Sequence, residues 1–216
     1  MASLKLLYRQ EVTDSASRAV GKTLQLGKGR GAVLVLCEGK GQMPQAAQAA
    51  QKALTTIEQQ FGSGDSQLNI ATSNVLASIV WINKDKVTVA GNGEVVCLHP
   101  QIGVHTLQEG LYNGDVILLA PTGLYKALTV QQIMNVVISN PTDLKAIHAS
   151  LSEIMKQKQE VLPTILMAFV SAGCKEPQSE VQEKGEESQT VSPKSIVWLI
   201  AAAVMTIATI VLLCLF

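Results

Sequence analysis

Charged residues are scarce in this sequence of 216 residues, and neither sign of charge is in excess. They make up 16% of the chain, against roughly 25% in ordinary soluble domains. The 17 basic residues balance the 17 acidic residues, whereas nucleic-acid-binding domains usually carry a basic excess. Nucleic acid is therefore excluded as an expected partner.

Recognisable motifs for metal binding and nucleophilic catalysis are also lacking. The four cysteines form no C-x-x-C pair, and the three histidines have no consistent spacing to one another or to acidic pairs. We therefore interpret all four cysteines as reduced, structural residues. Residues 16–23 (ASRAVGKT) end in Gly-Lys-Thr, as a phosphate-binding loop does, but alanine occupies the place of the loop's first glycine. This stretch is predicted to be a polar hairpin connection.

The shortage of charge has a local cause, an uncharged segment at residues 196–216 (IVWLIAAAVMTIATIVLLCLF). A helix of this length, at about 1.5 Å per residue, spans roughly the 30 Å hydrocarbon core of a bilayer. The segment therefore predicts one C-terminal transmembrane helix, a tail anchor whose partner is the lipid bilayer. Flanking basic residues lie only on its N-terminal side. The positive-inside rule then predicts that the N-terminal domain faces the cytoplasm.

Two further regions precede the membrane segment. Residues 173–195 (GCKEPQSEVQEKGEESQTVSPKS) are rich in glutamate and contain no aromatic residue. Such a stretch cannot bury enough apolar surface to fold, and it is predicted to be a disordered acidic tether. Residues 1–172 are long enough to form a domain with a sizeable core.

Strand signals alternate with helix signals along residues 1–172. Short apolar and β-branched runs predict strands at residues 4–12, 31–37, 75–82, 86–90, 94–98, 115–119 and 164–170. Helices are predicted at residues 44–61, after the capping box Thr129-x-x-Gln132, and from Asn140-Pro141 onward. Many strands with a few helices predict an α+β domain with two stacked, mainly antiparallel sheets and helices on their outer faces.

Four short blocks follow one another over residues 30–172: 38–42 (EGKGQ), 90–93 (AGNG), 113–124 (NGDVILLAPTGL) and 162–167 (LPTILM). In order and approximate spacing they resemble blocks of the metal-dependent protein phosphatases of type 2C, the PPM family. The family's corresponding blocks read Asp-Gly-Met-Gly-Gly, Gly-Asp-Ser-Arg, Gly-Asp before four apolar residues and Ser-Asp-Gly-Leu, and Asp-Asn-x-Thr. The resemblance implies a layered α-β-β-α sandwich. It is a minimal one, because the connection before Gly114-Asp115 is too short for the family's flap segment.

The resemblance also carries an expectation about metals. In the family, aspartate side chains and one glycine carbonyl hold two Mn²⁺ or Mg²⁺ ions, and a metal-bound water attacks phosphoserine or phosphothreonine. Thr122 and Val161 stand here where the family has metal-binding aspartates. Only Glu38 keeps a carboxylate, and Gly39 can offer its carbonyl. We therefore expect a vestigial metal site at Glu38 and Gly39, no catalytic residue and no cofactor.

Three functional interpretations follow. The first is a membrane-anchored pseudophosphatase, a catalytically inactive binding or regulatory domain whose partner is a phosphoprotein, a kinase or a phosphatase. The second is an active serine/threonine phosphatase that uses Mn²⁺ or Mg²⁺ in a site rebuilt from Glu38, Asp14 and Asp115. The third is a membrane-anchored interaction module unrelated to phosphatases.

Overall fold

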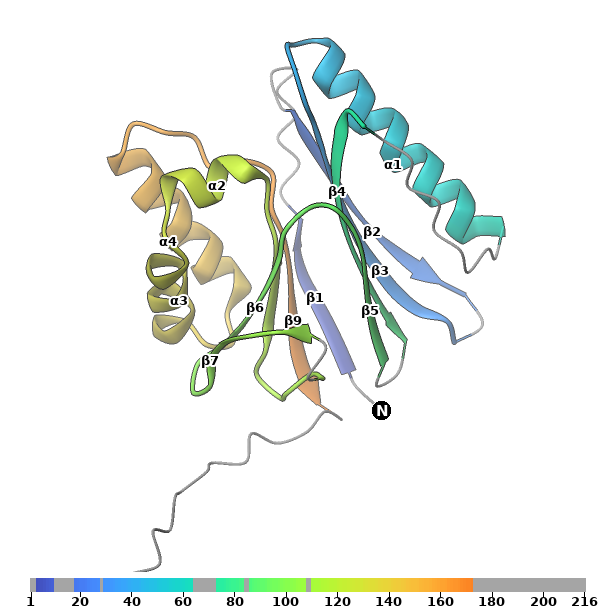
Figure 1. Cartoon of the computed structure of the whole chain (residues 1–216). Helices are drawn as coiled ribbons and strands as arrows, with labels where there is room; N and C mark the ends of the chain where they lie inside the picture. Colours follow the sequence, from blue (N-terminus) through green and yellow to red (C-terminus); the bar gives the residue numbers. More distant parts are fainter. Residues whose placement is uncertain are drawn as a thin grey trace, which may run out of the picture. The chain divides into compact units, whose positions relative to one another are not determined.

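Two antiparallel sheets form the centre of the domain in this computed structural model (Figure 1). The structure describes residues 3–9, 18–27, 29–63, 73–83, 86–107 and 110–172. No helix in these ranges is long and apolar enough to cross a membrane. The predicted tether (173–195) and membrane segment (196–216) lie outside the described residues.

Neighbouring strands are antiparallel throughout both sheets. The five-stranded sheet has the order β1 (Ser3–Arg9), β9 (Leu166–Ala172), β8 (Val116–Leu119), β6 (Val95–His99) and β7 (Gly103–His105). The four-stranded sheet has the order β2 (Ala19–Leu26), β3 (Gly31–Gly39), β4 (Val75–Asn83) and β5 (Lys86–Gly91). The chain therefore passes from one sheet to the other between β1 and β2 and returns between β5 and β6.

The sheets pack face to face because their central strands are apolar on both sides. Side chains alternate across a strand, so Leu34 and Leu36 of β3 point into the space between the sheets, where they meet Ile117 and Leu119 of β8. The intervening residues of β3, Val33 and its neighbours at 35 and 37, point outward against a helix. Residues 31–37 are thus apolar without interruption because both faces of this strand are buried.

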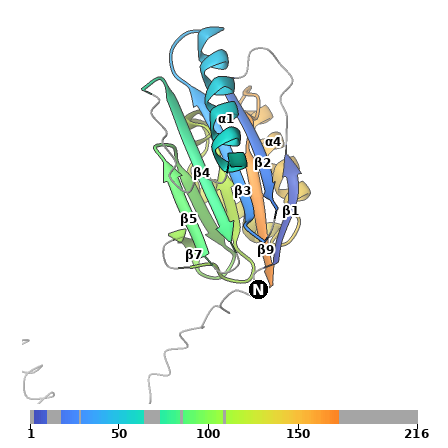
Figure 2. The same ribbon diagram turned by 90° about the vertical axis from the view of Figure 1, so that its right-hand side faces the viewer.

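Helices cover both outer faces and complete four layers, as Figures 1 and 2 show. Helix α1 (Gln45–Ser63) lies on the four-stranded sheet and buries one stripe of side chains: Ala46, Ala50, Leu54, Ile57 and Phe61. Helices α2 (Thr122–Ala127), α3 (Val130–Ser139) and α4 (Leu144–Gln157) pack on the five-stranded sheet. The predicted capping box is formed, since Thr129 and Gln132 each accept the other's backbone N–H. Helix α4 is capped by Asp143 rather than by Asn140.

The predicted α+β sandwich is confirmed, but the expectation for residues 16–23 is corrected. Residues 19–26 form strand β2 and not a polar hairpin connection. They lack a continuous apolar run, but every residue of β2 pairs in register with β3. Lys22 of this strand forms an ion pair with Glu58 of α1 at 2.8 Å. The pairing of β2, and not its own hydrophobicity, therefore makes it a strand.

Gly39 lies so close to α1 that no side chain fits at this position. A Cβ atom at this position would clash with the backbone of Ala46, in the first turn of α1. Substitution Gly39→Ala is expected to lower the free energy of unfolding by about 3 kcal/mol or more, because backbone on both sides must shift. Denaturant unfolding of the full chain, followed by circular dichroism, measures this.

Gly62→Ala is the matched control. Gly62 lies near the end of α1, and a Cβ there meets no atom within 4 Å. It should leave stability unchanged or raise it by up to about 1 kcal/mol. Equal effects of the two substitutions would contradict the packing argument.

Candidate functional site

Glu38 and Thr122, far apart in the sequence, meet where the two sheets end. Glu38 lies near the end of β3, and Thr122 is the first residue of α2, just beyond β8. The Thr122 N–H donates to Glu38 Oε2 at 2.9 Å. The Thr122 hydroxyl oxygen lies 2.7 Å from Oε1 and 2.8 Å from Oε2, within donating distance of both. Both carboxylate oxygens of Glu38 are thus engaged by one residue of the other sheet's layer.

The local sequence of α2 explains why the helix accepts this contact. Its N-cap is Pro121, which provides no side-chain cap, and the first N–H groups of a helix have no partner inside the helix. A carboxylate is favourable at that end because the helix dipole is positive there. Glu38 therefore acts as a cap supplied from the opposite sheet.

A small cavity of about 10 Å³ adjoins the contact, room for about one water molecule. Glu38 and Glu94 are the carboxylates that line it, and the other lining residues are small or apolar apart from Ser78 and Thr122. The Ser78 hydroxyl donates to the Glu94 backbone carbonyl at 2.9 Å. The described residues thus place two carboxylates at the cavity, fewer than a site for two divalent ions needs.

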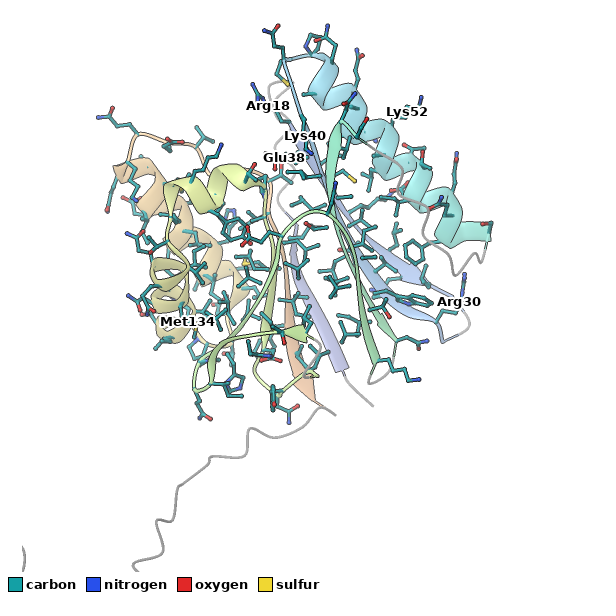
Figure 3. The ribbon with its side chains drawn as sticks, viewed as in Figure 1. Arg18, Arg30, Glu38, Lys40, Lys52 and Met134 are labelled. Atoms are coloured by element: carbon teal, nitrogen blue, oxygen red, sulfur yellow. The ribbon has the colours of Figure 1, made fainter. Side chains whose placement is uncertain are left out.

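Basic side chains lie at the same end of the domain. Arg18 directly precedes β2, and its carbonyl accepts the N–H of Gly39 at 2.8 Å. Lys40 directly follows β3. Figure 3 shows both side chains beside Glu38, whereas Lys52 projects from α1 farther along the domain. Arg18 and Lys40 are exposed, and neither forms an ion pair among the described residues.

The structure brings together only some of the residues selected from the sequence. Gly39 is buried and does not line the cavity, and packing against α1 accounts for its lack of a side chain. Val161 is 81% exposed and also lies outside the cavity lining. Neither position thus contributes to the lining of the cavity beside the Glu38–Thr122 contact.

Two residues of the metal site in the second interpretation, Glu38 and Asp115, lie at opposite ends of β8. Asp115 precedes β8 and Thr122 follows it, so the length of that strand separates Asp115 from the carboxylate of Glu38. Asp14 lies outside the described residues. Asp115 instead belongs to a different polar group.

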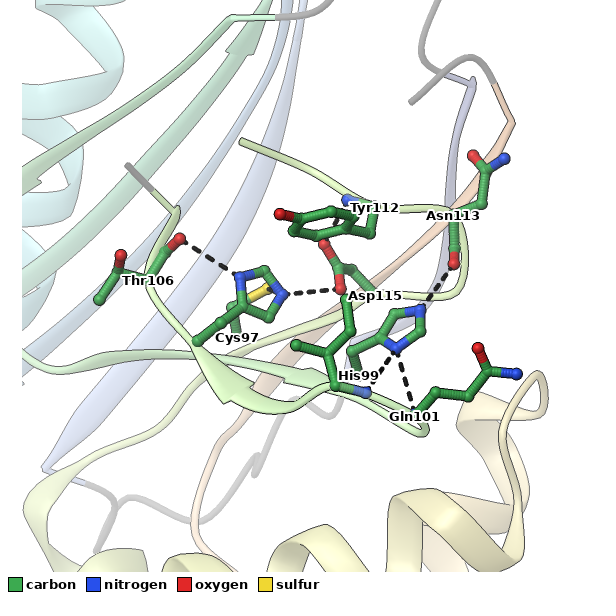
Figure 4. Close-up of polar contacts among 9 residues, drawn as sticks. Cys97, His99, Gln101, Thr106, Tyr112, Asn113 and Asp115 are labelled. Atoms are coloured by element: carbon green, nitrogen blue, oxygen red, sulfur yellow. Dashed lines mark hydrogen bonds and ion pairs between the residues drawn. The ribbon is translucent and has the colours of Figure 1, made fainter. Parts of the chain in front are cut away.

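That second polar group consists of Cys97, His105 and Asp115 (Figure 4). His105 Nε2 lies 2.8 Å from Asp115 Oδ1 and 3.3 Å from the Cys97 sulfur. The other carboxylate oxygen, Oδ2, accepts the Tyr112 N–H at 2.7 Å. Burial and the neighbouring negative charge of Asp115 raise the pKa of the Cys97 thiol. The thiol is therefore protonated at neutral pH.

Sequence reasoning missed this group because its members do not follow a motif spacing. Cys97 and His105 are opposite each other in the β6–β7 ladder, and this register is set by the turn between the strands. Only a prediction of the hairpin centred on residues 100–102 would have placed Cys97 opposite His105. Cys37 and Cys97 are both free and buried, as predicted, while Cys174 and Cys214 lie outside the described residues.

Comparison with known proteins identifies the fold. The sequence matches no family model and no curated protein. The structure is similar to the serine/threonine phosphatase Stp1 from Staphylococcus aureus, with a TM-score of 0.61 and 10% identity over 80% of this chain and 96% of that one. It is also similar to the S. agalactiae serine/threonine phosphatase, with a TM-score of 0.55 and 11% identity over 79% of this chain and 99% of that chain.

A third similar structure is the PP2C phosphatase domain of SpoIIE from Bacillus subtilis. Its TM-score is 0.58 and its identity 11%, over 80% of this chain and 64% of that chain. The chain has the type 2C phosphatase fold. The expected type 2C fold is therefore confirmed. At such low sequence identities the similarity shows only the fold. Any chemical activity has to be argued from the residues of the site.

Thr122→Asp is expected to destabilise the domain unless a divalent cation is added. The substitution replaces the hydrogen bond donated by the Thr122 hydroxyl with a second carboxylate against Glu38, so the free energy of unfolding should fall by about 1–3 kcal/mol. Mn²⁺ can bridge two carboxylates and should recover part of this loss. Thermal unfolding with and without Mn²⁺ measures both effects.

Thr122→Val serves as the control, because it removes the hydroxyl without adding charge. Mn²⁺ should leave its melting temperature unchanged. An equal gain from Mn²⁺ in the valine and aspartate variants would show that the ion does not bind at this contact.

Proposed function

We propose that the chain is a membrane-anchored domain of the type 2C phosphatase fold that binds a phosphorylated protein and does not hydrolyse it. The Glu38–Thr122 contact carries this proposal. It satisfies the carboxylate with an N–H and a hydroxyl, the role that a metal ion takes in a metal-dependent phosphatase. A carboxylate already held in this way has little to gain from a divalent ion.

The number of charges near the contact supports loss of hydrolysis. Two divalent ions bring four positive charges, which several carboxylates must balance. Among the described residues, Glu38 and Glu94 are the only carboxylates that line the cavity, whose volume of about 10 Å³ accommodates about one water molecule. This small number of carboxylates supports the proposed loss of catalysis by a pair of Mn²⁺ or Mg²⁺ ions.

Charge also supports a phosphorylated partner. Arg18 and Lys40 leave two exposed cations beside a carboxylate whose oxygens are already occupied. Arginine and lysine form charge-assisted hydrogen bonds to phosphate. A phosphoserine or phosphothreonine side chain thus fits this end of the domain, on a substrate protein, a kinase or another phosphatase.

Phosphothreonine peptides test binding and hydrolysis in one experiment. The full-length protein in detergent, with excess Mn²⁺, should retain phosphopeptides in preference to the same peptides without phosphate and should release no phosphate. The double substitution Arg18→Ala, Lys40→Ala should weaken retention by about tenfold or more, the loss of roughly 1.4 kcal/mol.

Lys52→Ala is the matched control, since it also removes an exposed cation but from α1. It should leave retention unchanged. Metal-dependent phosphate release that Glu38→Gln abolishes would replace this proposal with an active phosphatase. Equal retention of the phosphorylated and unphosphorylated peptides would contradict the proposed phosphorylated partner.

Membrane anchoring is the second part of the proposal. It rests on residues 196–216, which carry no charge, and on upstream basic residues that favour a cytoplasmic domain. Alkaline carbonate should leave the full-length chain in the membrane pellet, because a transmembrane helix resists such extraction, and should release a chain truncated after residue 195. Equal release of both chains would exclude the anchor.

A further inference from the structure

The geometry points to a zinc site formed by Cys97, His105 and Asp115, separate from Glu38 and Thr122. The three residues come from β6, β7 and the approach to β8, neighbouring parts of the five-stranded sheet (Figure 4). Cysteine sulfur, histidine nitrogen and a carboxylate oxygen are the ligands that zinc takes in proteins. This inference does not depend on the proposed function.

The ligand atoms already converge. One sulfur, one ring nitrogen and one carboxylate oxygen all lie within 4.8 Å of one another. Ligands of a tetrahedral zinc ion, at about 2.0–2.3 Å from the metal, are roughly 3.3–3.8 Å apart. The 3.3 Å between Cys97 and His105 meets this spacing, and the 2.8 Å between His105 and Asp115 needs to open by about half an ångström.

Neighbouring groups hold the ligands in the orientation that a metal requires. His105 Nδ1 lies 3.3 Å from the Thr106 carbonyl oxygen, and a proton on Nδ1 donated to that carbonyl leaves Nε2 free as a ligand. Such outer contacts are typical of histidines that bind metals. The Tyr112 N–H fixes Asp115, and the Tyr112 ring packs edge-on against His105 with centroids 5.2 Å apart.

Charge balance favours a divalent ion in this buried place. The side chains of His105 and Asp115 are only 3% and 0% exposed, and Cys97 is equally inaccessible. A thiolate and a carboxylate together neutralise Zn²⁺, so the filled site carries no net charge into the interior. Binding displaces the thiol proton, because cysteine binds zinc as the thiolate.

The ligand set also selects the metal. Sulfur and imidazole nitrogen favour zinc over magnesium, manganese and calcium, which prefer oxygen ligands. The cavity beside Glu38 presents oxygen donors. Of the two clusters, the Cys97 group is thus the one suited to zinc.

Metal content and cobalt spectroscopy test the site on the full-length protein in detergent. After chelation and addition of Zn²⁺, the desalted protein should retain about one zinc per chain. Co²⁺ in place of Zn²⁺ should give a thiolate-to-cobalt absorption band. Cys97→Ser should remove the band and weaken zinc retention at least about tenfold. His105→Gln should weaken zinc retention equally while keeping the thiol, and near-ultraviolet circular dichroism shows whether each variant is folded.

Cys37→Ser is the matched control, because Cys37 is a buried free cysteine on β3 that belongs to no such cluster among the described residues. It should keep both the band and the zinc. A wild-type protein that retains no zinc would overturn the inference, and so would a cobalt band that survives in Cys97→Ser. Loss of zinc in Glu38→Gln but not in Cys97→Ser would place the ion at the other cluster and overturn it as well.

Discussion

Burial of the central strands on both faces is the constraint on which the rest of the structure depends. Every residue of β8 is buried, and so is nearly every residue of β3. A strand covered on both sides cannot carry charged side chains along its length, because each would be desolvated without a partner. Charged groups therefore occur where these strands end, as Glu38 does near the end of β3 and Asp115 does before β8.

A buried or half-buried carboxylate lies at each end of β8, and different groups form hydrogen bonds with each. At one end, hydrogen bonds from Thr122 satisfy the carboxylate of Glu38 across the two sheets. At the other end, His105 and the Tyr112 N–H satisfy Asp115 within one sheet. The protein itself thus provides each of these two carboxylates with hydrogen-bond partners.

Sequence reasoning recovered the elements that have a strong pattern of their own. The continuous run of β3, the alanine-rich α1 and the capping box of α3 are each specified locally. Strand β2 was missed because its strand character comes from pairing with β3. The short α2 begins at a Pro-Thr-Gly sequence that resembles a turn, and it was missed for that reason.

The residues of the two polar clusters likewise differ in how far the sequence predicted them. The blocks at residues 38–42 and 113–124 led to Glu38 and Thr122, and the fold brings these two together. The block at residues 162–167 led to Val161, which is exposed. Cys97 lies close to His105 because the β6–β7 hairpin pairs them. The spacing of cysteines and histidines along the sequence does not reveal how the two strands are paired.

The pairing of β1 with β9 has a mechanical consequence. Ser3 lies opposite Ala172, so the two ends of the described domain emerge from the same end of one antiparallel ladder. A force between those points would separate the strands by peeling, one hydrogen bond after another, instead of shearing all of them at once. Register shifts interrupt this ladder between Ser3 and Leu4 and between Lys5 and Tyr8. Under tension β1 would therefore detach first, before the sandwich itself is disturbed.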